Sequence, residues 1–227
     1  GICRLCTLRN NRHLWYNVRQ RSDSRLSRKY DWREDDNSFA DANNIAIGDK
    51  IVGQISVNDD FDTYKFTLSQ VGCVKLDMTS YMQYYCIKLF NSDGEEIWYT
   101  SENEWTSTVG YRSDSYDLYL EKGTYYMQIN GYDWGTYYKS TGKYVCNTSF
   151  TGSGVSFDGD DNDFKTAKQI SWNKKYIGQI SENDDFDNYI FSVPKDQTIA
   201  IDITSYMRYY CIRIFDSDGK EIWETDD

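Results

Sequence analysis

Histidine and proline are almost absent from this chain, which has one of each in 227 residues. The histidine, His13, lies outside two repeated segments that make up most of the sequence. A Ser-His-Asp or Cys-His site within either segment is therefore excluded, because such a nucleophile needs a histidine base. Carboxylates are numerous, so residue type alone does not exclude a glycosidase. The repeated carboxylates precede strands and turns, however, and we expect a non-catalytic module.

Basic residues and long apolar runs are also scarce. The 25 Lys and Arg residues are outnumbered by 36 Asp and Glu, which gives a formal net charge of -11. This balance argues against nucleic-acid binding and suits a soluble, cation-binding extracellular module. No apolar run is long enough to cross a bilayer. The chain starts at Gly1 and ends at Asp227 within a repeated motif, so we expect both ends to be cut from a longer protein.

Aromatic residues are abundant instead, at 17% of the chain with 21 tyrosines. Apolar and polar residues alternate in short runs at 64–68, 74–78, 85–89 and 116–120. Alternation with many tyrosines is typical of half-buried strands, and turn residues such as those at 91–94 separate the runs. The pattern predicts an all-β sandwich or barrel.

Two segments of the chain are copies of one unit. Residues 53–66 read GQISVNDDFDTYKF and 178–191 read GQISENDDFDNYIF. Residues 79–98 read TSYMQYYCIKLFNSDGEEIW and 204–223 read TSYMRYYCIRIFDSDGKEIW, again 125 positions later. A period of this length is that of a whole domain rather than of a solenoid repeat.

The repeat sets the expected domain boundaries. Copy one covers 34–150, a short linker covers 151–156, and copy two covers 157–227 and is truncated. Residues 1–33 contain eight Arg and one Lys against two Asp, and we expect a basic linker or disordered segment. Cys3, Cys6 and His13 hint at zinc there, but a fourth ligand is absent.

Five motifs in copy one resemble the bacterial pre-peptidase C-terminal domain family. The segment 34–42 resembles its lead-in "E-P-N-[DN]-S-F-x-x-A", and 59–66 resembles its strand "D-x-D-x-Y-x-F". Residues 85–94 resemble "L-x-L-[YF]-[ND]-x-x-G", 122–132 resemble "A-G-T-Y-Y-[IV]-x-V-x-G-Y", and 142–145 resemble "G-x-Y-x-[LV]". Copy two carries the lead-in and the first two strand motifs.

The resemblance implies a jelly-roll-like β-sandwich that is secreted, non-catalytic and usually attached to an enzyme such as a protease. The family includes the collagen-binding domains of bacterial collagenases, and some members bind calcium near the lead-in and the aspartate-rich loop. For this chain it implies oxygen ligands of the kind that calcium prefers. The implied ligands are Glu34, Asp36, Asn37, Asp59 and Asp62 in copy one, with Asp161, Asn162, Asp184 and Asp187 in copy two.

The calcium hypothesis has an alternative, since Asp and Asn side chains also cap turns and begin strands. Glu34 corresponds to Gly159 in copy two, which weakens the hypothesis there. The Asp-Gly sequences at 91–94 and 216–219 lack the downstream Glu of a calcium loop, and we interpret both as hairpin turns.

An aromatic loop before the last strand of copy one is the predicted ligand-binding surface, because exposed aromatic rings stack on peptides and sugars. Its residues are Tyr132, Trp134, Tyr137 and Tyr138. The alternative is that about half of the tyrosines pack in the core. Cysteine pairing also stays open between Cys73–Cys146, Cys86–Cys146 and free thiols.

We therefore expect an accessory module of a secreted bacterial enzyme or cell-surface protein, with a catalytic domain in the same polypeptide. It would bind an extracellular protein or polysaccharide, and calcium. The alternative is a structural spacer repeat of a surface protein without a ligand. A hydrolase domain is the third hypothesis.

Overall fold

The computed structural model describes residues 2–5, 38–59, 61–100, 111–131, 140–157 and 161–225, with the backbone alone for 2–5. All regular secondary structure in these ranges is β-strand, and within them no helix has the length and apolarity to span a bilayer. The chain divides into two compact units. The sandwich unit is Arg21–Ser153, and the composite unit joins Gly1–Gln20 to Gly154–Asp227.

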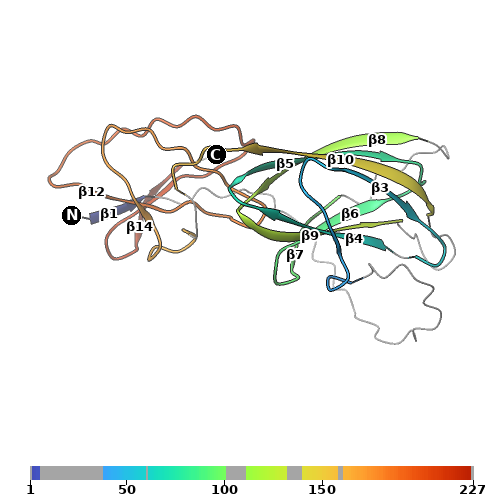
Figure 1. Cartoon of the computed structure of the whole chain (residues 1–227). Helices are drawn as coiled ribbons and strands as arrows, with labels where there is room; N and C mark the ends of the chain where they lie inside the picture. Colours follow the sequence, from blue (N-terminus) through green and yellow to red (C-terminus); the bar gives the residue numbers. More distant parts are fainter. Residues whose placement is uncertain are drawn as a thin grey trace. The chain divides into compact units, whose positions relative to one another are not determined.

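The sandwich unit contains two sheets that form two layers (Figure 1). One sheet has the strand order β3-β10-β5-β8 and the other has the order β2-β4-β9-β6-β7. The strands are β2 (Asn43–Asn44), β3 (Lys50–Ile55), β4 (Phe61–Leu68), β5 (Gly72–Ser80), β6 (Cys86–Phe90), β7 (Glu96–Tyr99), β8 (Arg112–Leu120), β9 (Gly123–Asn130) and β10 (Gly142–Gly152).

The core of this unit lies between the two sheets and follows from the alternation in the sequence. Val74, Leu76 and Met78 on β5 are buried, and they meet Met127 and Ile129 of β9 in the same apolar cluster. Burying one such side chain contributes about 1.5–3 kcal/mol. The predicted all-β sandwich is therefore confirmed for this unit.

The Asp-Gly segments form the hairpin turns that the sequence predicts. Gly94 donates its N–H to the carbonyl of Asn91 at 3.1 Å and has a φ of 83°. This positive φ is costly for a residue with a Cβ atom. Gly219 repeats the turn against Asp216 at 3.1 Å with a φ of 82°.

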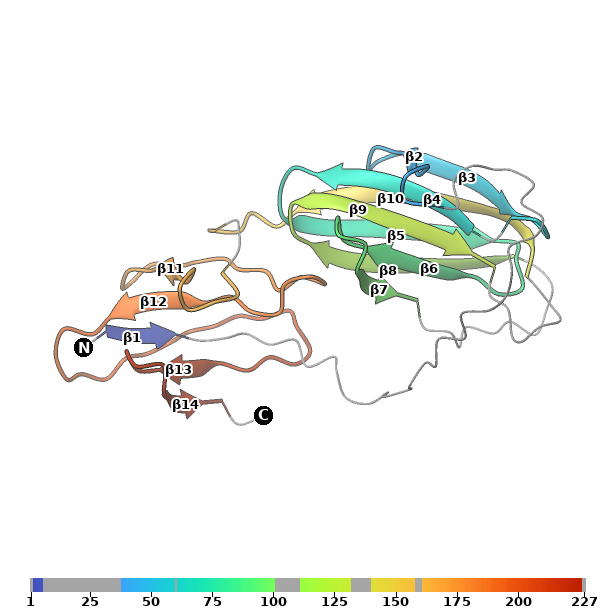
Figure 2. The ribbon, with the colours of Figure 1, turned by 90° about the horizontal axis from the view of Figure 1, so that it is seen from below.

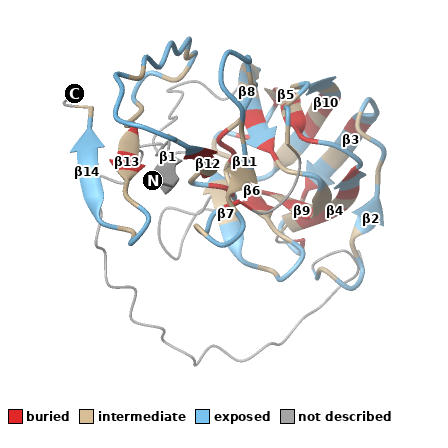
Figure 3. Cartoon of the chain, turned by 90° about the vertical axis from the view of Figure 1, so that its left-hand side faces the viewer, coloured by how far each residue is buried: buried red, intermediate tan, exposed pale blue. Residues whose placement is uncertain are grey.

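The composite unit has one five-stranded sheet with the order β11-β12-β1-β13-β14 (Figure 2). Four of its strands come from copy two, and the fifth comes from the first residues of the chain. β14 is exposed along its whole length (Figure 3). The strands are β1 (Ile2–Leu5), β11 (Lys168–Gln169), β12 (Tyr189–Ser192), β13 (Arg213–Phe215) and β14 (Glu221–Glu224).

Residues 1–33 were expected to form a linker or a disordered segment, but four of them, Ile2–Leu5, form strand β1. Ile2–Leu5 pair with β12 on one side and with β13 on the other. The physical reason is that two neighbouring strands otherwise present unpaired N–H and C=O groups to each other, and an inserted strand satisfies both edges. The zinc hypothesis involves Cys6 and His13, which lie outside the described residues.

A second sheet does not form among the described residues of the composite unit. The segments at 175–180 and 197–205, which correspond to β3 and β5, have no strand structure. In copy one both of these strands pair with β10, not with each other. Several of their apolar residues are consequently exposed, with exposed fractions of 44% for Ile177 and 41% for Ile203.

Of the alternatives that the sequence left open, neither disulfide pairing is formed, and Cys73, Cys86, Cys146 and Cys211 form no disulfide. On the paired strands β5 and β10, Cys73 opposes Thr151 whereas Cys146 opposes Met78. Cys86 belongs to the other sheet. The side chains therefore lack the close Cβ approach that a disulfide requires.

Candidate metal centre

Three acidic side chains of copy two meet in one buried cluster. Asp161, Asp184 and Asp187 each offer a carboxylate oxygen within 4.8 Å of the other two. Their exposed fractions are 4%, 7% and 6%. Oxygen ligands about 2.4 Å from a common calcium ion lie at most about 4.8 Å apart, so the spacing fits one ion.

Local backbone structure holds the three acids in place. Asp184 closes a tight turn in which the amides and carbonyls of Ser181 and Asp184 bond reciprocally, at 3.0 and 3.3 Å. Asp187 lies two residues before β12. Asn188 donates its side-chain amide to the carbonyl oxygen of Asp161 at 2.6 Å. The lead-in is thereby tied to the start of the strand.

The electrostatics of the cluster favour a bound cation. Three ionised carboxylates at this distance repel one another, and burial reduces the solvent screening of that repulsion. Burial raises the pKa of Tyr189 well above its ordinary value, and the charges of Asp187 and Asp161 raise it further. Tyr189 is therefore protonated at neutral pH and donates its hydroxyl to Asp187.

The corresponding acids of copy one are also buried. Asp59 and Asp62 have exposed fractions of 5% and 3%. Asp62 accepts a hydrogen bond from the hydroxyl of Tyr144, whose oxygen lies 2.6 Å from that of Tyr64. Burial is the largest cause that raises the pKa of Tyr144, followed by Tyr64 and Asp62. Tyr144 on β10 thus reaches across the core to β4.

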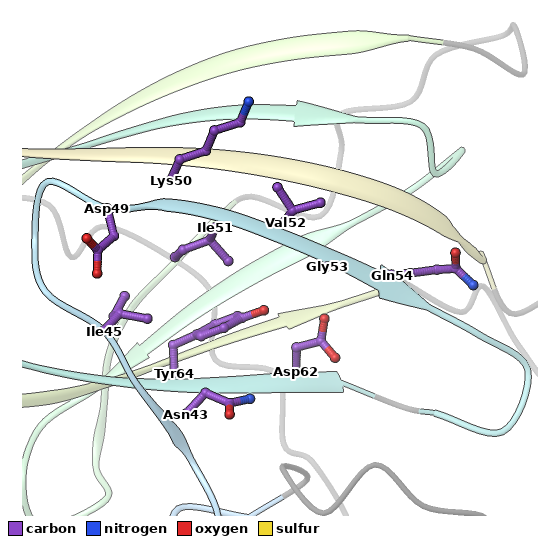
Figure 4. Close-up of a pocket in the computed structure, with 10 residues that line it drawn as sticks. All are labelled: Asn43, Ile45, Asp49, Lys50, Ile51, Val52, Gly53, Gln54, Asp62 and Tyr64. Carbon is purple, nitrogen blue, oxygen red and sulfur yellow. The ribbon is translucent and has the colours of Figure 1, made fainter.

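A pocket of about 430 Å³ adjoins this bond between β3 and the β2–β4 side of the sandwich (Figure 4). Asp62 and Tyr64 rise from β4 toward β3 in this view. The pocket is lined by Asn43, Ile45, Asp49, Lys50, Ile51, Val52, Gly53, Gln54, Asp62 and Tyr64. One acid of the predicted site therefore borders an open polar cavity.

A glycine stands against the acid in both copies. A Cβ atom on Gly53 would lie 2.6 Å from Asp62 Oδ2 and 2.2 Å from the hydroxyl of Tyr144. A Cβ atom on Gly178 would lie 2.3 Å from Asp187 Oδ2. A residue with a Cβ atom at either position would force these buried side chains to move.

The structure places the other predicted residues as follows. Asn162 is exposed. Glu34, Asp36 and Asn37, and the aromatic set Tyr132, Trp134, Tyr137 and Tyr138, lie outside the described residues. Sequence analysis did not identify Tyr144, Tyr189, Asn188 or the paired glycines. The available signals were that Asn188, Tyr189 and both glycines fall inside the repeated strings, and that Tyr144 is the tyrosine of the motif at 142–145.

An exposed aromatic pair lies on the sandwich unit. The rings of Tyr81 and Tyr111 meet edge to face with centroids 5.8 Å apart, and their exposed fractions are 48% and 67%. The Tyr81 amide donates to the carbonyl of Lys143 at 2.9 Å. The Tyr84 amide donates to Ser140 Oγ at 2.9 Å. The loop that carries Tyr81 is thus attached to the segment that follows the predicted aromatic loop.

One buried thiol predicts a pH dependence of stability. Burial, and then the charge of Asp77, raises the pKa of Cys146 from 9.0 to about 12. At a pH between these two pKa values, the unfolded chain loses the thiol proton and the folded chain keeps it. The free energy of unfolding therefore falls as the pH rises. The contribution is about 1.4 kcal/mol per pH unit. We expect Cys146→Ala to remove that part of the slope in denaturant titrations from pH 9 to 11. Parallel wild-type and variant curves would contradict it.

The known proteins to which this chain was found to be similar are collagenases. No family model matches the chain. Collagenase ColA of Clostridium perfringens (strain 13 / Type A) is 26% identical over an alignment of 184 residues, and the match covers 74% of this chain and 16% of the collagenase. The crystal structure of the pre-peptidase C-terminal domain of a collagenase from Bacillus anthracis has 18% identity and a TM-score of 0.36, and the match covers 48% of this chain and 94% of that one. The match to a clostridial collagenase agrees with the resemblance that the sequence motifs indicated.

Proposed function

From its similarity to the pre-peptidase C-terminal domain family, we propose that this chain is a non-catalytic accessory module of a secreted bacterial enzyme or surface protein. The observation that carries the proposal is the sequence match to a clostridial collagenase, of which the chain spans only 16%. A match to so small a part of a large enzyme fits a module that is appended to a catalytic domain. The module binds an extracellular protein or polysaccharide and holds calcium.

The aromatic surface supports the binding role. Tyr81 and Tyr111 are exposed as a pair. Hydrogen bonds to the carbonyl of Lys143 and to the side-chain hydroxyl of Ser140 fix the loop around Tyr81. Two rigid rings offer a large contact area at a small entropic cost. The residues predicted from sequence, Tyr132 and Trp134 among them, shortly precede Ser140 in the chain.

The acidic cluster of copy two supports the calcium role. Calcium takes six to eight oxygen ligands, and Asp161, Asp184 and Asp187 supply the first three carboxylates. Asp161 belongs to the lead-in, while the other two precede β12. An ion held among them ties the lead-in to the strand and neutralises a buried negative charge. Asp59 and Asp62 form the matching part of a site in copy one.

Sedimentation with insoluble polymers tests the binding role. The full chain is incubated with collagen, cellulose, chitin and peptidoglycan, with 5 mM calcium (roughly five times the upper affinity range of extracellular modules). We expect binding to one of them, and a loss of about tenfold in affinity or more for Tyr81→Ala and for Trp134→Ala. Tyr119→Ala is the matched control, because Tyr119 is similarly exposed, at 46%, but lies on β8.

The outcomes separate the two functions considered from the sequence. Binding that Tyr81→Ala and Trp134→Ala weaken, and that Tyr119→Ala leaves unchanged, supports the accessory role. Absence of binding to all four polymers favours a structural spacer repeat instead. An equal loss with all three variants contradicts the assignment of the surface.

A further inference from the structure

Strand β1 occupies in the composite unit the place that β9 occupies in the sandwich unit. The sheet orders are β2-β4-β9-β6-β7 and β11-β12-β1-β13-β14. At the offset of 125, β11, β12, β13 and β14 lie within the counterparts of β2, β4, β6 and β7. The remaining strand, third in each order, is β9 in one sheet and β1 in the other (Figure 2).

The register of β1 also matches that of β9 on both sides. Met127 of β9 pairs with Tyr64 and with Leu89. Leu5 of β1 pairs with Tyr189 and with Ile214, which are the counterparts of Tyr64 and Leu89. Both strands run antiparallel to both neighbours. Since a slip of one residue would move every side chain to the other face, this match places Leu5 at the register position of a buried methionine.

β9 and β1 each lie in a slot between two strands. These two flanking strands, the walls of the slot, have nearly the same amino-acid sequence in the two copies. The wall formed by β4 reads FDTYKFTL at 61–68 and its counterpart reads FDNYIFSV at 186–193. The wall formed by β6 reads CIKLF and its counterpart reads CIRIF at 211–215. In copy one these walls hold a strand whose inward residues Tyr125, Met127 and Ile129 are at most 1% exposed. The same walls in copy two therefore favour an extended segment with alternating apolar residues.

We propose that the slot between β12 and β13 is a strand-acceptor site and that Ile2–Leu5 is its occupant in this chain. Backbone pairing on both edges supplies the binding, as in β-strand addition. The occupant pairs through four residues with β12 and through two with β13. Strand β9 pairs through eight residues with β4 and through five with β6. A strand of the β9 type therefore makes the longer ladder and competes with β1 for the slot.

The experiment uses the full chain and a labelled peptide of residues 122–131 (KGTYYMQING) as the probe. In the wild type, β1 is tethered to the slot at an effective concentration of about millimolar, so the peptide binds weakly. Leu5→Asp puts a charge at the register position of a buried methionine and releases β1. We expect this variant to bind the peptide about tenfold more tightly than the wild type or more. Arg4→Thr is the matched control, because Arg4 takes the register position of the partly exposed Tyr126.

Hydrogen exchange identifies the site and covers the case in which Leu5→Asp fails to fold. Peptide binding is expected to slow amide exchange in 186–193 and 211–215. In the wild type without peptide, the amides of residues 3–5 are expected to exchange slowly. Absence of saturable peptide binding by both chains overturns the acceptor site. Equal affinity of the two chains, or exchange of residues 3–5 at the rate of an unstructured segment, overturns β1 as its occupant.

Discussion

Replacing Tyr144 with alanine is expected to lower the free energy of unfolding of the sandwich unit by about 4 kcal/mol. The side chain is fully buried and spans the space between the two sheets, from β10 to Asp62 and Tyr64 on β4. Its removal leaves a cavity in the core and removes a hydrogen-bond donor from the buried carboxylate of Asp62. Both changes cost free energy.

Tyr144→Phe separates the hydrogen bond from the packing. This variant keeps the ring but loses the hydroxyl that Asp62 accepts, and we expect a loss of about 1–3 kcal/mol. Urea unfolding with chelator present measures both variants without a contribution from calcium. Tyr119→Phe on β8 is the control, since its side chain is 46% exposed. A Tyr144→Phe variant as stable as Tyr119→Phe would contradict the bond between the sheets.

Asp187→Asn is expected to stabilise the calcium-free protein and to destabilise the calcium-loaded protein. Without calcium it removes one of three buried like charges, so the composite unit gains stability. With calcium it removes a ligand, and the wild type becomes the more stable. With affinities typical of extracellular sites, 10 mM calcium stabilises the wild type by about 1.4–2.7 kcal/mol.

Thermal unfolding with chelator and with 10 mM calcium (a concentration about tenfold above the weak end of the typical range) measures this reversal. A unit of this size shifts its midpoint by about 4–8 °C per kcal/mol. The control is Asp196→Asn, because Asp196 is exposed on the same copy and should respond to calcium as the wild type does. A calcium shift of equal size in all three proteins would count against the cluster as the site.

The sequence was sufficient to predict the parts of the fold that local pattern controls. Alternation predicted the inward face of β5 through Val74, Leu76 and Met78, and all three are buried. The turn at Asn91–Gly94 followed from residues whose side chains bond their own backbone, and Asn91 Oδ1 accepts the amides of Asp93 and Glu95. Such features depend on a few consecutive residues, so the sequence alone contains them.

Features that depend on distant segments were beyond reach from the sequence. Nothing local in 142–145 shows that the hydroxyl of Tyr144 meets Asp62, which is 82 positions away. The role of β1 depends on the facing edges of β12 and β13. Their backbone N–H and C=O groups can pair with a strand from any part of the chain. The loss of strand structure at 175–180 has the same origin, because β3 depends on a ladder with β10.

The acidic site was predictable in part. The resemblance identified Asp161, Asp184 and Asp187 as candidates, and the structure brings these three together. It did not indicate Asn188, whose amide fixes the carbonyl of Asp161. Copy one has Thr63 at that position, so the difference between the copies was visible in the sequence, but its consequence was not.

The most direct test of the account is to locate calcium in the protein by anomalous diffraction from crystals grown with the ion. We expect an anomalous peak about 2.3–2.6 Å from carboxylate oxygens of Asp161, Asp184 and Asp187. A map without density among these carboxylates, or with the three side chains turned apart toward solvent, would contradict the account.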